Sequence, residues 1–260
     1  MSDNGELSGR VALVTGASYG LGYSIAEELA RRGAAVMISD ISDQRDEAAE
    51  KLRAAGCKAA AVHIDVRDLA LVQAGVARTV EAFGRLDILV ANAAMPRTAT
   101  PILEMDAATW DAAYAVNVRG TLFSFRAAAE QMIRQGEGGR LIAISSTAGL
   151  KPYADRSHYC STKAAVIQLT KVAGLEFASH KITANVVCPG QSNTENLRKM
   201  LDGSTGQAAA EEMRARQARI PLGPNEPIDI ANAVAFFASP AARTVTGQIM
   251  AVEGGGLMTG

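Results

Sequence analysis

The sequence predicts an α/β fold with a seven-stranded parallel sheet, doubly wound and flanked by helices on both faces. Short apolar runs alternate with longer amphipathic stretches along the chain, and this order implies right-handed crossovers between parallel strands. Each run is nearly continuous in apolar character, as expected of a strand covered on both faces. The predicted strands are Val11–Val14, Ala34–Ile38, Ala60–Ile64, Leu86–Val90, Leu141–Ile144, Ala184–Cys188 and Ile249–Val252.

Helices are predicted between these strands. Leu21, Ile25 and Leu29 recur at i, i+4 and i+8 and so share one helix face, and a second helical pattern covers Ala208–Arg219. No Pro- or Ser-rich linker divides the chain, which predicts a single domain over all 260 residues. Residues 191–222 leave the carboxyl end of a strand, where doubly wound sheets bind ligands, and are predicted to form a substrate lid.

Composition limits the classes of partner. Of the 260 residues, 48% are hydrophobic, which suffices for one sizeable core. Lys and Arg number 26 against 27 Asp and Glu, and a net charge of -1 argues against binding to nucleic acid or to an anionic membrane. Three scattered cysteines without a CxxC pattern argue against a disulfide scaffold or a metal site. With no apolar signal-peptide core at the start, they predict a cytoplasmic protein.

A glycine-rich turn, TGASYGLG, follows the first strand. Gly16 permits a tight turn, Gly20 lets backbone N–H groups approach a pyrophosphate, and Gly22 allows the following helix to pack closely. The spacing GxxxGxG differs from the commoner GxGxxG fingerprint but has the same physical basis. The turn residues predicted to bind a dinucleotide are Gly16, Ser18, Tyr19, Gly20 and Leu21.

An acidic residue ends the second strand. Asp40 stands 18 residues after Gly22, where a carboxylate can accept hydrogen bonds from both hydroxyls of the adenosine ribose. Its charge repels a 2′-phosphate, and the positions where a cation would hold that phosphate carry Ser18, Tyr19 and Ile41. The sequence therefore favours NAD over NADP.

The segment SHYCSTKAA carries a candidate acid–base pair. Tyr159 and Lys163 are four residues apart, so a helix places both on one face. A phenol loses its proton only near about pH 10, and a neighbouring ammonium group favours the ionised form. This pairing indicates proton transfer without a metal.

These motifs together resemble the short-chain dehydrogenase/reductase family, in its single-domain branch with a Rossmann fold. The resemblance runs from about Gly9 to Gly256. Its motifs appear in the family order: TGASYGLG, Asp40, Asp65-Val66, Ala91-Asn92-Ala93-Ala94, Asn117, Ser145-Ser146, Tyr159 with Lys163, and Pro189-Gly190.

The resemblance implies a catalytic set of four residues. Tyr159 would be the general acid/base for hydride transfer between an alcohol carbon and a nicotinamide, and Lys163 would hydrogen-bond the nicotinamide ribose. Ser146 would orient the substrate oxygen, whereas Ser145 would point to the opposite face of its strand. The carbonyl of Asn117 would hold a water that links the lysine to solvent.

The resemblance also implies further cofactor contacts. Asp65 and Val66 would lie against the adenine, and Asn92 with Ala93 would support the cofactor and the central strand. The backbone near Ser192 and the hydroxyl of Thr194 would hold the carboxamide, and Pro189 would also contact the cofactor. Three positions depart from the family pattern, namely Ala94 for a glycine, Ser192 for Ile or Val, and Glu253 for an aspartate. Members with similar C-terminal tails form tetramers or dimers, so a homotetramer, or else a homodimer, is expected.

The predicted function is NAD-dependent hydride transfer to or from a secondary alcohol of a polyol, sugar or hydroxy acid. An NADPH-dependent 3-oxoacyl-[acyl-carrier-protein] reductase is the alternative, and the missing cation near Asp40 argues against it. A non-catalytic NAD-sensing protein is a third reading, and the intact Tyr159 and Lys163 argue against that. Arg97 and Arg156 fall in loops where they could meet an anionic substrate, although solvated loop charges are the commoner case.

Overall fold

Seven parallel strands form one sheet in the order β3-β2-β1-β4-β5-β6-β7. The computed structural model describes the chain except for residues 1–4, 96–97, 195–196, 199–200, 202–206 and 260. The strands are β1 (Val11–Thr15), β2 (Ala35–Asp40), β3 (Ala59–His63), β4 (Ile88–Ala91), β5 (Gly139–Ile144), β6 (Ile182–Pro189) and β7 (Ile249–Val252). The predicted doubly wound fold is confirmed, and no strand end differs from its predicted position by more than two residues.

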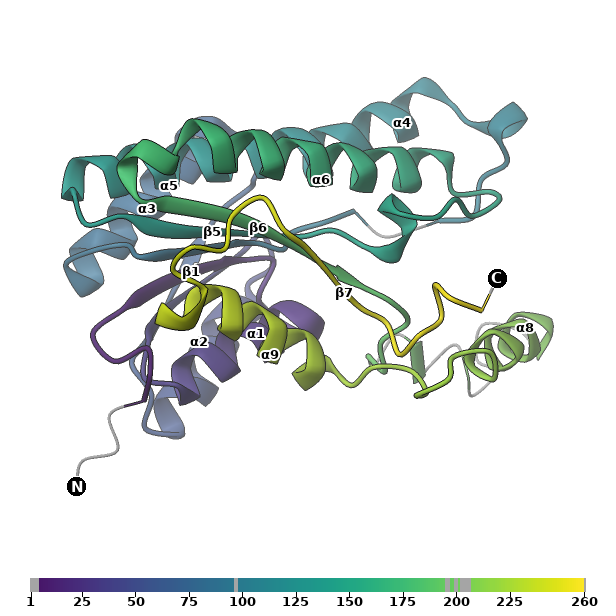
Figure 1. Cartoon of the computed structure of the whole chain (residues 1–260), viewed down its shortest axis with the longest axis horizontal. Helices are drawn as coiled ribbons and strands as arrows, with labels where there is room; N and C mark the ends of the chain where they lie inside the picture. Colours follow the sequence, from purple (N-terminus) through teal and green to yellow (C-terminus); the bar gives the residue numbers. More distant parts are fainter. Residues whose placement is uncertain (1–4, 96–97, 195–196, 199–200, 202–206, 260) are drawn as a thin grey trace.

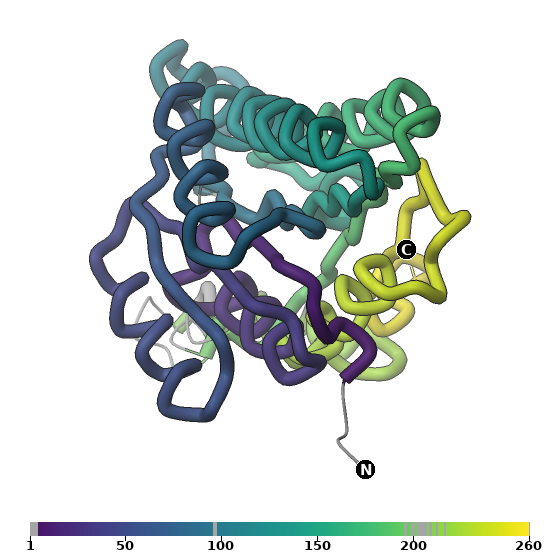
Figure 2. Tube along the Cα trace, turned by 90° about the vertical axis from the view of Figure 1, so that its left-hand side faces the viewer, coloured from purple at the N-terminus to yellow at the C-terminus, as the bar shows by residue number. Residues whose placement is uncertain are grey.

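Helices cover both faces of the sheet (Figures 1 and 2). The lower layer of Figure 1 consists of α1 (Gly20–Arg31), α2 (Gln44–Ala54) and α9 (Pro227–Ala238). The upper layer consists of α3 (Leu69–Phe83), α5 (Gly120–Gln135) and α6 (Ser157–Glu176), with α4 (Ala107–Tyr114) beside them. The predicted helix Ala208–Arg219 is observed as α8 (Gln207–Gln217). Short helical turns span Ile102–Glu104, Ala115–Arg119, Thr147–Gly149, Ala178–His180 and Pro240–Ala242.

Two hydrophobic clusters, one on each face, account for the continuous apolar runs. Along β1, Ala12 and Val14 pack with Ile25 of α1 in the lower cluster. Leu13, between them, packs in the upper cluster with Phe125 of α5. Because successive side chains of a strand point to opposite faces, both sets must be apolar where helices cover both faces.

The outer strands β3 and β7 are covered less completely than the sequence predicts. His63 at the end of β3 and Ile249 at the start of β7 are exposed, and most other side chains of these two strands are only half-buried. Each strand has a neighbour on one side only. The prediction of full cover on both faces is therefore wrong for these two strands, which lie where the helical layers end.

The common direction of the strands brings their carboxyl ends to one edge of the sheet. Thr15, Asp40 and Pro189 end three of these strands, and α8 and the C-terminus lie beyond the same edge (Figure 1). In doubly wound sheets this edge is where ligands bind. Within the described ranges, no helix combines the length and apolar character that crossing a membrane requires.

A buried carboxylate fastens α1 to its surroundings. Glu28 is 1% exposed and accepts hydrogen bonds from Nε of Arg31 at 2.7 Å and from Nε of Arg32 at 2.6 Å. Arg32 also donates to Glu6, ahead of β1, and to Asn232 of α9. The hydrogen bond from Arg31 holds the pKa of Glu28 below its usual value of 4.5, against the opposing effect of burial.

We expect Glu28→Gln to lower the free energy of unfolding by about 1–3 kcal/mol at pH 7, because two guanidinium groups lose their carboxylate. A carboxylate with a lowered pKa stabilises the fold above its usual pKa, so the difference should shrink as the pH falls below 4.5. Urea unfolding above and below that pH measures it. The control Glu81→Gln removes an exposed partner of Arg78 and should cost less than about 0.5 kcal/mol. Equal losses in both variants would contradict the prediction.

Candidate active site

Two glycines of the turn after β1, Gly16 and Gly22, leave no room for a side chain. Gly16 has a φ of +64°, and a Cβ there would lie 2.7 Å from Cα of Ala93. A Cβ at Gly22 would lie 2.1 Å from the carbonyl oxygen of Gly16. Gly22 thus lets α1 begin directly against the turn, as the sequence predicts.

The segment after β4 holds the glycine turn in place. The Nδ2 group of Asn92 donates to the carbonyl oxygens of Thr15 at 3.0 Å and Gly16 at 2.8 Å. In return, Oγ1 of Thr15 accepts from the backbone N–H groups of Asn92 at 3.0 Å and Ala93 at 3.1 Å. These hydrogen bonds connect Asn92 directly to the end of the central strand β1, as the predicted supporting role requires. Thr15 was not among the predicted site residues, although its position directly before the first glycine of the turn could have indicated this contact.

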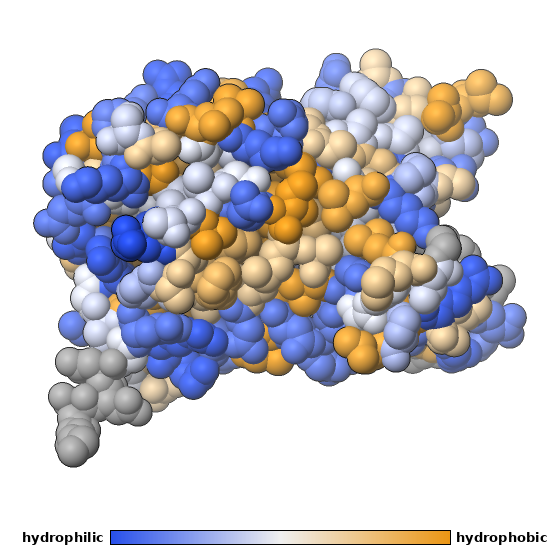
Figure 3. Space-filling view, viewed as in Figure 1, coloured by the Kyte–Doolittle hydropathy of each residue, from blue (hydrophilic) through white to orange (hydrophobic). Residues whose placement is uncertain are grey.

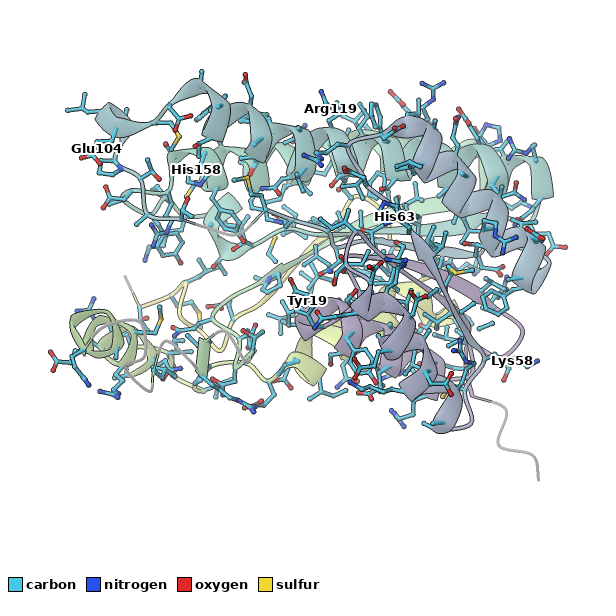
Figure 4. The ribbon with its side chains drawn as sticks, turned by 180° about the vertical axis from the view of Figure 1, so that it is seen from behind. Tyr19, Lys58, His63, Glu104, Arg119 and His158 are labelled. Atoms are coloured by element: carbon cyan, nitrogen blue, oxygen red, sulfur yellow. The ribbon has the colours of Figure 1, made fainter. Side chains whose placement is uncertain are left out.

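The carboxylate of Asp40 faces the glycine turn. Its Oδ2 accepts from the backbone N–H of Ser18 at 3.2 Å, and its Oδ1 accepts from that of Ser42 at 3.1 Å. Among the residues that the structure describes, Asp40 forms no ion pair. Tyr19, at the start of α1 in Figure 4, and Ile41 are both exposed beside this turn. Asp40 thus lies next to the turn predicted to bind the pyrophosphate.

Asp65 and Val66 follow β3, next to the strand that Asp40 ends. Asp65 forms an ion pair with Arg67, whose Nη2 lies 2.6 Å from Oδ2, and the hydrogen bond from Arg67 lowers the pKa of Asp65. Val66 is buried against α5, where a Cβ on Gly120 would lie 2.6 Å from Cγ2 of Val66. Their place beside the adenine stays a prediction.

The structure brings Tyr159 and Lys163 together on α6. Lys163 is 3% exposed, and its Nζ lies 5.6 Å from the centroid of the Tyr159 ring. The same Nζ donates to the carbonyl oxygen of Ile144 at 2.9 Å. A buried ammonium is costly unless it is paired or hydrogen-bonded, and this carbonyl at the end of β5 is one partner. Lys163 therefore presents a fixed positive charge beneath the tyrosine ring.

The two serines after β5 make different contacts, and the substrate contact of Ser146 stays a prediction. The Oγ of Ser145 donates to the carbonyl oxygen of Lys163 at 2.8 Å and so ties α6 to the sheet. The Oγ of Ser146 accepts from the backbone N–H of Ala148 at 3.1 Å and caps the short turn there. Because a hydroxyl that accepts still carries its own hydrogen, Ser146 retains a donor.

Asn117 connects three segments of the site. It is buried in a single π-helical turn, Ala115–Arg119, a feature common at functional sites. Its Oδ1 accepts from the backbone N–H of Met95 at 2.8 Å, and its Nδ2 donates to Oγ1 of Thr162 at 3.0 Å. That Oγ1 donates in turn to the carbonyl oxygen of Tyr159 at 2.9 Å. The role predicted for the Asn117 carbonyl stays a prediction, and Thr162 is a contact that the sequence analysis missed.

Two loops pair just ahead of α6, the helix that carries Tyr159. The backbone N–H of Thr100 donates to the carbonyl oxygen of Asp155 at 2.9 Å, and Thr100 forms an isolated parallel bridge with Arg156. His158 is buried in the upper layer of Figure 4, and its burial lowers its pKa. Arg97, a predicted candidate for contact with substrate, lies outside the described residues.

Unpartnered polar atoms at this edge fit a dinucleotide. The buried Oγ of Ser18, in the glycine turn, has no hydrogen-bond partner among the described residues, and the same holds for Nε2 of Gln191 and Oγ of Ser192 after β6. A Cβ on Gly20 would meet nothing within 4 Å, which leaves its backbone open to a ligand. Buried polar groups normally have hydrogen-bond partners, and a bound ligand could supply them for these three atoms. Gln191 is a further candidate that the sequence analysis missed.

The segment after β6 is only partly described. Pro189 ends β6, and the backbone of Ser192 bridges to that of Asn225. The carbonyl oxygen of Ser192 accepts from the backbone N–H of Thr194 at 2.7 Å, and Oγ1 of Thr194 accepts from that of Leu197 at 3.4 Å. Contacts of these residues with a carboxamide stay a prediction.

Comparison with known proteins places this architecture in a family. The chain matches a family model described as enoyl-(acyl carrier protein) reductase over residues 16–256. It is 38% identical over 263 residues to a sorbitol dehydrogenase of Cereibacter sphaeroides, covering 98% of this chain and 100% of that one. It is 37% identical over 246 residues to cis-4-hydroxycyclohexanecarboxylate dehydrogenase of Sinomonas cyclohexanicum, covering 95% and 96% of the two chains.

A solved structure agrees with these relatives. A short-chain type dehydrogenase/reductase from Mycobacterium marinum superimposes with a TM-score of 0.87 at 32% identity, covering 96% of each chain. The matches extend over nearly the whole chain and include the glycine turn and the Tyr159–Lys163 pair. The chain belongs to the short-chain dehydrogenase/reductase family of oxidoreductase enzymes.

Proposed function

We propose that this enzyme is an NAD-dependent alcohol dehydrogenase that acts on a secondary alcohol of a polyol, sugar or hydroxy acid. The observation that carries the proposal is the buried ammonium of Lys163, 5.6 Å from the Tyr159 ring centroid, at the sheet edge that also holds the glycine turn. A tyrosine held there can exchange a proton with the hydroxyl of a bound alcohol, which is the acid/base role proposed for Tyr159.

These contacts support the following proposed roles. When bound, the nicotinamide supplies the acceptor for the hydride that leaves the carbinol carbon. The phenolate oxygen of Tyr159 takes the hydroxyl proton as the alcohol becomes a carbonyl, and returns it in the reverse direction. The O–H of Ser146 donates to the substrate oxygen and orients it. Lys163 uses one N–H on Ile144, and its other N–H groups can hold the cofactor ribose.

Asp40 supports NAD as the cofactor. Its carboxylate stands against the glycine turn, where it can accept from the two ribose hydroxyls and would repel a 2′-phosphate. Arg45, in the first turn of α2, is held by Asp43 at 2.8 Å and by Asp46 at 3.4 Å. A 2′-phosphate would have to compete with these carboxylates for that cation.

Two alternatives are less well supported. The first is a 3-oxoacyl-[acyl-carrier-protein] reductase using NADPH. The family model is described by a different reaction, that of an enoyl-(acyl carrier protein) reductase, and Asp40 opposes NADPH. A non-catalytic NAD-sensing protein would not need the Tyr159–Lys163 pair or the free donor of Ser146. The names of the two relatives, which specify a polyol and a hydroxylated ring acid, favour an alcohol dehydrogenase.

We further propose that residues 191–222 form the lid of a single domain, 1–260. The segment leaves the carboxyl end of β6 and includes α8, beyond the edge that carries Tyr159 (Figure 1). Residues 195–196, 199–200 and 202–206 of the lid lie outside the described part of the chain. A cytoplasmic location is proposed from the three scattered cysteines, which suit a reducing compartment.

A homotetramer is proposed from exposed apolar side chains. On the upper layer, Leu122 of α5 and Val172 and Leu175 of α6 are exposed, and Leu175 is 80% exposed. Ile249 of β7 and Phe236 of α9 are exposed as well. Figure 3, in the same view as Figure 1, shows apolar side chains gathered across the middle of the molecule, over β7. Burial of two such surfaces against further copies would produce a tetramer.

The first test is NAD reduction by the purified enzyme across polyols, sugars, hydroxy acids and simple secondary alcohols. With the best substrate found, Tyr159→Phe is expected to lower kcat by roughly 10²–10⁴-fold, because the acid/base group is lost. Binding of NADH, followed by its fluorescence, should stay nearly unchanged. The control Tyr23→Phe removes a phenol that bonds Glu27 in α1 and should keep full activity. Substantial turnover in Tyr159→Phe would disprove the proposed role.

The cofactor proposal is tested by Asp40→Ala. We expect the KM for NAD to rise roughly tenfold or more, because hydrogen bonds to a charged acceptor are lost, and use of NADP to improve, because the repulsion is removed. Steady-state kinetics with both cofactors measure the change. Glu47→Ala, which removes an exposed carboxylate of α2 that pairs with Lys51, is the control and should leave both cofactors unaffected. A wild-type preference for NADP would show that the ribose argument is wrong.

The assembly proposal is tested by Leu175→Glu. A carboxylate on this exposed face of α6 should convert the tetramer to a smaller species in light scattering, because a charge would be buried unpaired. Leu103→Glu, at a fully exposed leucine of the turn before α4, should leave the mass unchanged. A monomeric wild-type enzyme would exclude the tetramer.

A further inference from the structure

A cavity of about 560 Å³ lies at the amino-terminal edge of the sheet. Its walls include Arg10 just before β1, Asp87 just before β4, Arg140 in β5 and Thr183 in β6. Figure 2 views the molecule from the side where these strands begin. A six-residue strand such as β5 spans about 20 Å, so the cavity is separated from the Tyr159 region by the full length of the strands.

Three cations of this cavity have no carboxylate partner among the described residues. Arg140, Lys181 and Arg243 line it, and none forms an ion pair with any residue that the structure describes. Arginine is always charged in proteins, so the wall that these residues form carries a positive charge.

The carboxylates of the cavity are already occupied. Asp87 accepts from Arg10 at 2.8 Å and from Arg85 at 2.7 Å, and it also accepts from the backbone N–H of Val11. Glu137 is held by Arg85 at 2.7 Å. These contacts satisfy both acids, and the unpaired charge of the cavity is therefore positive.

Two unpartnered polar atoms sit side by side in the same wall. Arg140 and Thr183 are register partners across β5 and β6, and directly opposite residues project to the same face of a sheet. The buried Nε of Arg140 and Oγ1 of Thr183 have no hydrogen-bond partner within the described ranges, and Thr183 is only 7% exposed. Burial and the nearby charge of Arg10 lower the pKa of Arg140. A bound anion would satisfy both atoms and offset that repulsion.

Lys181 has a backbone conformation that favours other residues. Its φ is +60°, in the left-handed region where glycine and asparagine are easily accommodated and a lysine is strained. Its carbonyl oxygen accepts from the backbone N–H of Gly139 at 3.3 Å, which holds this corner against β5. The residue ends the short turn Ala178–His180, and its backbone N–H donates to the carbonyl oxygen of Ala178.

We propose that this cavity is a second ligand site, separate from the catalytic one, which binds a small polyanion. The ligand class is a small molecule with several anionic oxygens, either phosphates or carboxylates. Arg140, Lys181 and Arg243 would neutralise it, and Thr183 would donate a hydrogen bond.

Calorimetric titration with tripolyphosphate and with citrate tests the proposal. The enzyme is first saturated with NADH or NADPH, whichever it binds, so that the ligands cannot occupy the dinucleotide site. We expect at least one of the two to bind, and the better one identifies the phosphate or carboxylate form. In the double variant Lys181→Asn, Arg243→Gln, the Kd should rise about tenfold or more, because two charge-assisted contacts are lost.

A charge-matched control separates the cavity from general electrostatics. Lys58→Asn with Arg78→Gln removes the same charge from residues outside the cavity, and Figure 4 places Lys58 at the same end of the molecule, before β3. This control should keep wild-type affinity. Asparagine is well tolerated at the φ of Lys181, so the test variant should remain folded and active. Failure of both polyanions to bind the wild type, or equal weakening in the two double variants, would overturn the proposal.

Discussion

The common direction of the seven strands is the constraint from which the rest of this enzyme follows. Because every strand runs the same way, residues far apart in the chain meet at one of two edges. Thr15, Asp40 and Asn92 meet at the carboxyl edge and hold the backbone of the glycine turn. Arg140 and Thr183 meet at the opposite edge and form the wall of a positive cavity. One sheet thus provides two chemically distinct ends, and only the first belongs to the catalytic proposal.

Buried polar contacts position α6, the helix that carries Tyr159 and Lys163, against that sheet. Lys163 is held twice, by its ammonium on Ile144 and by its carbonyl oxygen, which accepts from Ser145. A second chain of hydrogen bonds runs from Asn117 through Thr162 to the backbone of Tyr159. Such buried groups are costly when unpaired, so each contact also selects one position of the helix. The relative position of Tyr159 and Lys163 therefore depends on these hydrogen bonds between buried polar groups.

Local pattern explains which predictions from the sequence succeed. The strand runs are visible because two helical layers require apolar side chains on both faces, as Leu13 and Val14 show on successive positions. The spacing of Tyr159 and Lys163 is readable because a helical turn fixes their relation. The sequence predicts burial less well for β3 and β7, because the helical layers cover these outer strands only in part. Thr162 and Gln191 were missed because nothing in their local sequence marks their partners.

By itself, the sequence determined the parallel α/β fold, the glycine turn, the acidic residue at the end of β2 and the tyrosine–lysine pair. Each depends on spacing within one element or on one junction between elements, which short-range geometry fixes. Only the tertiary structure decided which polar atoms remain unpartnered and where the basic residues collect. Arg140, Lys181 and Arg243 are scattered along the chain, and they share a cavity because three different loops and strand starts converge at one edge. Convergence of this kind is a property of the packed sheet, and no local pattern of residues encodes it.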